Sequence, residues 1–105
     1  MSDMPKLDCE SPHVKRFVAL VNQLREPTNP DTYAGCQVSP KYLKVVILPK
    51  KGLGLGHFFA CIDRLTGDVL LAVSDSSIAK GVRGNIFDDD NGRSALDDHG
   101  NIRHF

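Results

Sequence analysis

The sequence contains no tryptophan, few aromatic residues and only three cysteines, and its charges cancel. No apolar run approaches the roughly 18 residues of a membrane-spanning helix. The first residues lack a basic segment followed by an apolar one, so we expect no signal peptide. Three cysteines are too few for the disulfide framework that is typical of small secreted domains. We therefore expect a cytoplasmic location.

The chain has 105 residues, of which 41% are apolar and 25% are charged. These values are typical of one small globular domain and argue against disorder, collagen and coiled coil. The net charge of zero excludes a globally basic nucleic-acid binder but leaves room for a local basic patch.

A helix is predicted from Ser11-Pro12, with serine as the N-cap and proline in the first turn. Apolar residues follow at helical spacing and form one stripe: Val14, Phe17, Val18, Val21 and Leu24. Pro27 ends the helix near Arg25. We expect residues 1–10 to be a flexible arm and residues 11–105 to form a single domain.

Three strands are predicted over residues 42–48, 57–62 and 68–73, which are rich in β-branched and apolar residues. Residues 27–40 are rich in proline and turn formers, so we expect a loop there. Residues 63–67 form a turn in which Gly67 can take positive φ. The sequence thus predicts an α+β fold, with one amphipathic helix on a small, curved, antiparallel meander.

Both faces of the predicted hairpin over residues 57–73 are apolar. If Ile62 pairs with Asp68, Phe59 lies opposite Leu71 on one face, while Phe58 lies on the other face. A single helix covers only one of these faces. We expect the second face to be covered by the C-terminal segment, by closure of the sheet or by a second copy in a homodimer.

A basic, glycine-rich segment spans residues 41–51 and continues into the following loop. No acidic residue occurs between residues 32 and 62. Glycine backbone and lysine side chains can contact phosphate or an acidic protein surface. The candidate binding residues are Lys41, Lys44, Lys50, Lys51, Gly52 and Gly54. The pattern lacks both the P-loop and the dinucleotide-binding spacings.

A second set of residues carries thiol chemistry. Cys9 precedes a helix N-terminus, which favours a thiolate. His57 begins a strand, and Asp75 follows the next one, where a carboxylate can orient the imidazole. This chain order resembles that of papain-like thiol hydrolases. The resemblance implies Cys9 as nucleophile, His57 as base and Asp75 as the orienting group.

The acidic run around Asp88, Asp89 and Asp90 resembles part of a calcium loop, but Phe87 stands where the first ligand belongs. We predict a polar turn there. His57 and Cys61 on one strand lie too far apart to share a zinc ion. We expect no metal and no cofactor.

The sequence favours a small non-enzymatic binding or regulatory protein that acts through protein contacts. A partner with an acidic surface fits the basic segment, and an accessory protein of a phage or mobile element fits the overall profile. The first alternative is a weak nucleic-acid-contacting module that uses residues 41–51. The second is the thiol hydrolase built on Cys9, His57 and Asp75.

Overall fold

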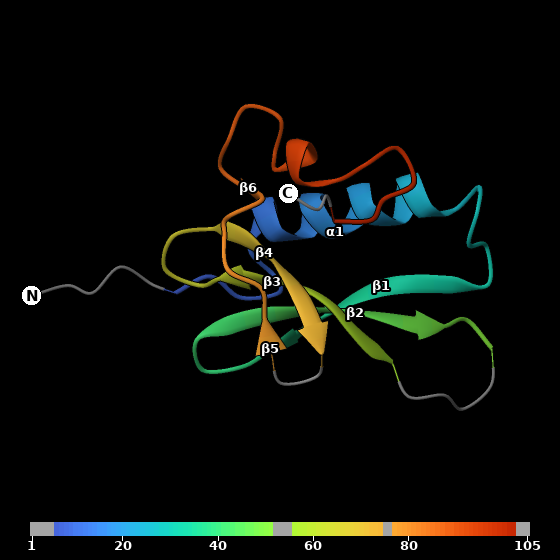
Figure 1. Ribbon diagram of the computed structural model, residues 1–105, viewed down its shortest axis with the longest axis horizontal. Helices are drawn as coiled ribbons and strands as arrows, with labels where there is room; N and C mark the ends of the chain where they lie inside the picture. Colours follow the sequence, from blue (N-terminus) through green and yellow to red (C-terminus); the bar gives the residue numbers. More distant parts are fainter. Residues whose placement is uncertain (1–5, 52–55, 75–76, 103–105) are drawn as a thin grey trace, which may run out of the picture.

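The computed structural model describes residues 6–51, 56–74 and 77–102. One helix packs on an antiparallel sheet of six strands, which is the predicted α+β class (Figure 1). The elements along the chain are α1 (Pro12–Arg25), β1 (Thr32–Val38), β2 (Tyr42–Pro49), β3 (His57–Asp63), β4 (Asp68–Ser74), β5 (Ser77–Ile78), β6 (Gly84–Asn85) and the 3-10 turn η1 (Arg93–Ala95).

The helix begins and ends where the sequence predicts. Val14, Phe17 and Val21 are fully buried, as the apolar stripe requires. Ser11 takes the N-cap position, but its side chain does not cap α1. Its Oγ instead accepts a hydrogen bond from Asp8 N at 3.0 Å. The predicted capping interaction is therefore wrong, although the helix boundary is confirmed.

The predicted loop over residues 27–40 is wrong in part, because it contains strand β1. This strand forms one edge of the sheet, whose order is β1-β2-β3-β4-β5, and β6 also pairs with β4. Along β1, Ala34 and Cys36 lie opposite Ile47 and Val45 of β2. Small core-facing side chains give β1 a weak apolar pattern, so sequence reasoning missed it.

The meander from β2 to β4 is confirmed, but its register differs from the predicted pairing. Ile62 pairs with Val69 rather than with Asp68. The register between β2 and β3 also shifts between Val45 and Val46. This bulge adds one residue, Phe59, which joins the core together with Ala60 and Ile62 of β3.

The core lies between the sheet and a layer made of α1 and the chain after β6. Ile86, Ala95, Leu96 and Ile102 join the helix residues in this single cluster. Figure 1 shows both segments on the same side of the sheet. The C-terminal segment over residues 84–102 therefore covers the helix side, not the second face. Among the described residues, no helix is long and apolar enough to cross a membrane.

Candidate functional site

Two lysines of the predicted binding set lie on the face of the sheet that points away from α1. Leu43 and Val45 of β2 are buried in the core, so Tyr42 and Lys44 project from the opposite face. Lys41 Nζ lies 5.4 Å from the centre of the Tyr42 ring. Lys44 Nζ lies 5.4 Å from the centre of the Phe58 ring. We call Lys41, Tyr42, Lys44 and Phe58 the outer-face patch.

The bulge in β3 explains why Phe58 lies on the opposite face from Ala60, with which it would share a face in a regular strand. Phe58 pairs with Val46 on the outer face, whereas the next residue turns into the core. Lys44, directly opposite Cys61, can therefore reach along β3 to the Phe58 ring. A cation over an aromatic ring is attracted by the ring quadrupole, typically by about 0.5–1 kcal/mol at exposed sites. The sequence did not reveal these rings as partners of the lysines.

The other predicted binding residues lie elsewhere. Lys50 follows β2, roughly 20 Å along the strand from Lys44. Its Nζ forms an ion pair with Glu26 Oε2 at 3.0 Å, beside the end of α1. Lys51 is exposed next to it. The structure thus brings Lys41 and Lys44 together but separates them from this pair. Gly52 and Gly54 lie outside the described residues.

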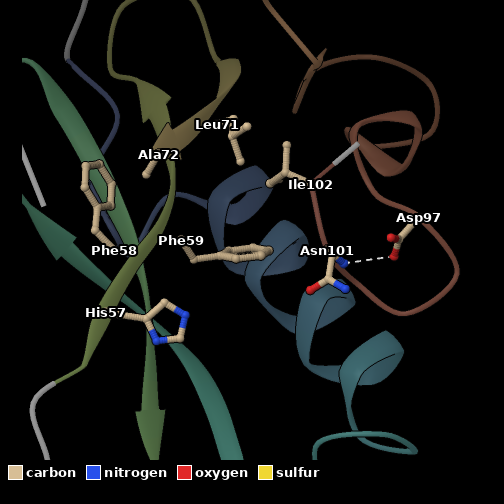
Figure 2. Close-up of a pocket in the computed structure, with 8 residues that line it drawn as sticks. All are labelled: His57, Phe58, Phe59, Leu71, Ala72, Asp97, Asn101 and Ile102. Carbon is tan, nitrogen blue, oxygen red and sulfur yellow. Dashed lines mark hydrogen bonds between the residues drawn. The ribbon is translucent and has the colours of Figure 1, made fainter. Parts of the chain in front are cut away.

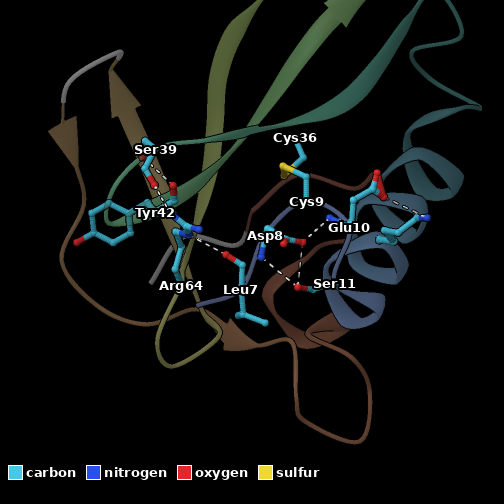
Figure 3. Close-up of a disulfide and its surroundings, with 10 residues drawn as sticks. Leu7, Asp8, Cys9, Glu10, Ser11, Cys36, Ser39, Tyr42 and Arg64 are labelled. Atoms are coloured by element: carbon cyan, nitrogen blue, oxygen red, sulfur yellow. Dashed lines mark hydrogen bonds and ion pairs between the residues drawn. A yellow bond between two sulfur atoms is a disulfide. The ribbon is translucent and has the colours of Figure 1, made fainter. Parts of the chain in front are cut away.

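The proposed nucleophile Cys9 is bonded to Cys36 in a disulfide, with a sulfur–sulfur distance of 2.05 Å (Figure 3). Its sulfur is therefore not a thiolate, and this corrects the assignment of Cys9 as a nucleophile. His57 is exposed on β3, two strands away from β1. Asp75 lies outside the described residues. The structure does not bring Cys9 and His57 together.

The disulfide holds the end of the segment that was expected to be a flexible arm. Figure 3 shows Leu7 of this segment beside Arg64. Leu7 N donates to Arg64 O at 2.9 Å, and Arg64 Nε donates to Leu7 O at 2.7 Å. Arg64 Nη1 also donates to Ser39 O at 3.0 Å. Residues 1–5 lie outside the described residues.

Cys61, the third cysteine, is a free and fully buried thiol, as its apolar surroundings predict. Burial, reinforced by the nearby Asp63 carboxylate, raises the pKa of the Cys61 thiol to about 12. This thiol therefore stays protonated at neutral pH and is a poor nucleophile.

A groove of about 550 Å³ opens where β3 and β4 separate (Figure 2). Pairing of these strands ends at Ala60 and Leu71. The sheet side of the groove is mainly apolar, and the opposite wall comes from the C-terminal segment. The lining residues are His57, Phe58, Phe59, Leu71, Ala72, Asp97, Asn101 and Ile102.

Arg25 connects this groove to α1. Its guanidinium carbon lies 5.5 Å from the centre of the Phe59 ring, and its Nη1 donates to Asn101 Oδ1 at 2.8 Å. Burial lowers the pKa of Arg25, and the negative charge of Asp97 partly opposes this shift. Asp97 Oδ1 in turn accepts from Asn101 N at 3.0 Å. These contacts fix the wall of the groove.

The acidic run forms a turn after β6, as predicted. Asp88, Asp89 and Asp90 are exposed. Asp90 accepts hydrogen bonds from Gly92 N at 3.0 Å and Ser94 N at 2.9 Å, and so supports the start of η1. Within the described residues, no group of three or more acidic, histidine or cysteine side chains is arranged to hold a metal ion.

Comparison of the chain with protein-family models, with curated proteins and with solved structures finds no match.

Proposed function

We propose that the protein is a small non-enzymatic binding module whose outer-face patch contacts an acidic surface on a partner protein. The observation that supports this most is the pairing of Lys41 and Lys44 with aromatic rings on one face of the sheet. The rings hold both lysine stems against the sheet, while the ammonium groups remain available to carboxylates. Complementary charge of this kind speeds association and orients the partner.

The surroundings of the patch favour an acidic partner. The sequence has no acidic residue between residues 32 and 62, and Asp63, which lies opposite Tyr42, accepts hydrogen bonds from Leu65 N and Thr66 N in its own turn. Within the described part of the chain, the ion pairs involve Lys15, Lys50 and Arg93, and neither lysine of the patch takes part. A partner carboxylate would therefore not compete with one of the protein's own.

Nucleic acid is the second candidate, because exposed aromatic rings beside lysines on an open sheet can stack bases. Here Tyr42 and Phe58 are each half-buried and already have a lysine over the ring. Lys50 is engaged with Glu26, so residues 41–51 do not present four lysines on one surface. We therefore place an acidic protein before nucleic acid.

The location of the protein bears on the same proposal. A cytoplasmic location follows from the sparse cysteines, but the Cys9–Cys36 disulfide weighs against it, because such bonds are rare in the cytosol. Denaturing the freshly isolated protein in excess alkylating agent without reductant, and counting the alkylated cysteines by mass, distinguishes the two. One alkylated cysteine per chain indicates an oxidising compartment, and three indicate a reducing one.

Binding to two model polyanions tests the patch. Polyglutamate and a mixed-sequence single-stranded DNA are titrated against the protein at low and moderate salt. The test variant is Lys41→Glu/Lys44→Glu, and the matched control is Lys50→Glu/Lys51→Glu, which has the same change in charge at the far end of β2. We expect polyglutamate binding to be lost in the test variant and largely kept in the control.

Two results would contradict the proposal. Equal loss in both variants would show that net charge, and not the patch, determines binding. Binding to DNA that depends on Lys41 and Lys44, without binding to polyglutamate, would favour the nucleic-acid reading instead.

A further inference from the structure

Strand β1 has a free edge. The Lys50 amide donates to Asp31 O at 2.9 Å, at the point where the pairing of β1 with β2 starts. Successive residues of a strand direct their backbone groups to opposite sides, so in β1 only alternate residues bond to β2. By this alternation, Ala34, Cys36 and Val38 turn their N–H and C=O groups away from β2.

The first of these residues is already occupied by a side chain that imitates a peptide group. Asn22 Oδ1 accepts from Ala34 N at 2.7 Å, and Asn22 Nδ2 donates to Ala34 O at 3.1 Å. No described residue bonds to the outward N–H and C=O groups of Cys36 and Val38. The Val38 side chain is also 55% exposed. The edge can therefore pair with another strand beyond Asn22.

A small hollow lies beside this edge, between β1 and one stripe of α1. Its volume is about 270 Å³, which leaves room for an aliphatic side chain, and its lining is mainly apolar. The lining residues are Cys9, Lys15, Val18, Ala19, Asn22 and Cys36. A strand paired with β1 would direct alternate side chains toward α1, and one of them would reach the hollow.

The charges around the edge favour an acidic strand. Neither β1 nor β2 contains an acidic residue. Lys15 lines the hollow, and Lys41 lies in the turn after β1. Two carboxylates flank Cys9. Asp8 accepts hydrogen bonds from Glu10 N and Ser11 Oγ, whereas Glu10 lies 3.5 Å from Lys15 with both side chains largely exposed, so an incoming carboxylate can replace Glu10. A second copy of β1 would instead bring lysine against lysine.

We propose that the groove between β1 and α1 binds an extended segment of a partner protein as an added β-strand. The segment carries an aliphatic side chain for the hollow and acidic residues on either side of it. Strand addition of this kind takes its affinity from main-chain hydrogen bonds and its specificity from side-chain pockets. The groove lies on the α1 side of the sheet, so this site is distinct from the outer-face patch. The two proposals can therefore be tested independently.

The probe is a short synthetic peptide that alternates valine and glutamate, titrated into isotope-labelled, disulfide-bonded protein and followed by NMR. The same peptide with alternate backbone nitrogens methylated is the control ligand. Val38→Pro removes an outward N–H that β2 does not use, and proline is tolerated at such edge positions. Val38→Thr keeps that N–H.

A second pair of variants tests the hollow in case Val38→Pro perturbs the fold. Ala19→Leu fills the hollow, and Gln23→Leu makes a similar change one helical turn away, outside it. In the parent protein, we expect the peptide to cause chemical-shift changes that are confined to the amides of β1 and of the facing stripe of α1. Val38→Pro and Ala19→Leu should each weaken binding by roughly tenfold or more, which corresponds to the loss of about one hydrogen bond or one buried side chain. The two control variants should retain binding.

Any of three results of the peptide titration would overturn the proposal: no chemical-shift changes at β1, changes that the methylated peptide reproduces, or affinity that is unchanged in both test variants. Shifts at β1 that depend on protein concentration without peptide would show that a second copy takes the edge, and would also overturn it.

Discussion

The side chain of Asn22 forms two hydrogen bonds with the backbone of Ala34, to its N–H at 2.7 Å and to its C=O at 3.1 Å. This contact joins α1 to the edge strand, and it saturates one residue of an edge that would otherwise be open. The same side chain thus holds the fold together and closes one end of the groove.

Replacing Asn22 with alanine leaves the Ala34 N–H and C=O without these partners. We expect Asn22→Ala to lower the free energy of unfolding by about 1–3 kcal/mol, measured by urea denaturation. Gln23→Ala, at the exposed neighbouring position, should change it by less than about 0.5 kcal/mol. Equal effects of the two substitutions would contradict the role assigned to Asn22.

Reducing the disulfide removes a cross-link between residues that are 27 positions apart in the sequence. A loop of this size is expected to contribute about 3–4 kcal/mol by restricting the unfolded chain. We expect the free energy of unfolding, measured by urea denaturation with a reductant present, to be lower by that amount. The variant Cys9→Ser/Cys36→Ser should match the reduced protein and should not respond to reductant. Unchanged stability of the parent protein on reduction would refute this account.

Gly100 has φ of 77°, which side chains with a Cβ rarely adopt. A Cβ there would lie 2.6 Å from Arg25 Cγ and 3.1 Å from Val21 O. We expect Gly100→Ala to destabilise the protein by roughly 1–3 kcal/mol, because the chain around Gly100 must move away from α1. Gly35→Ala is the control, since a Cβ at Gly35 would meet only side-chain atoms, the nearest at 3.3 Å. In thermal unfolding, Gly100→Ala should lower the melting temperature clearly more than Gly35→Ala does.

The Cys61 thiol should resist alkylation in the folded protein. Its pKa is raised from the ordinary 9.0 to about 12, so the unfolded chain loses this proton first as the pH rises. The contribution of this group to stability is therefore full below about pH 9 and declines toward pH 12. Iodoacetamide at pH 8 should label this thiol only after denaturant is added. Rapid labelling under native conditions would contradict its burial.

The helix and three central strands could be predicted from the sequence because their signals are local. Pro12 and the apolar stripe that starts at Val14 define α1, and β-branched runs define β2 to β4. Strand β1 lacks such a signal, since its core-facing residues include Ala34 and Cys36, and its stability depends on pairing with β2. The local sequence pattern of a strand does not reveal which residues, distant in the sequence, it pairs with.

The arrangement of the candidate surfaces was less predictable. Lys44 could be placed on one side of its strand by simple alternation, but its contact with Phe58 depends on the bulge, which shifts the register by one residue. The disulfide joins Cys9 and Cys36 because α1 and β1 pack side by side, and no spacing in the sequence reveals this. The free edge of β1 was missed together with the strand itself.

The packing of the C-terminal segment against α1 has a consequence for biosynthesis. Gly92 lies so close to Phe17 that a Cβ at Gly92 would be 3.1 Å from the ring, and Asn101 bonds to Arg25 across 76 positions of sequence. A nascent chain that has emerged only as far as β4 therefore carries a helix with one uncovered apolar side. Such contacts of long sequence separation form slowly. The final contacts of α1 thus form only after residues 92–101 have emerged from the ribosome, and until then one apolar side of the helix is open to aggregation.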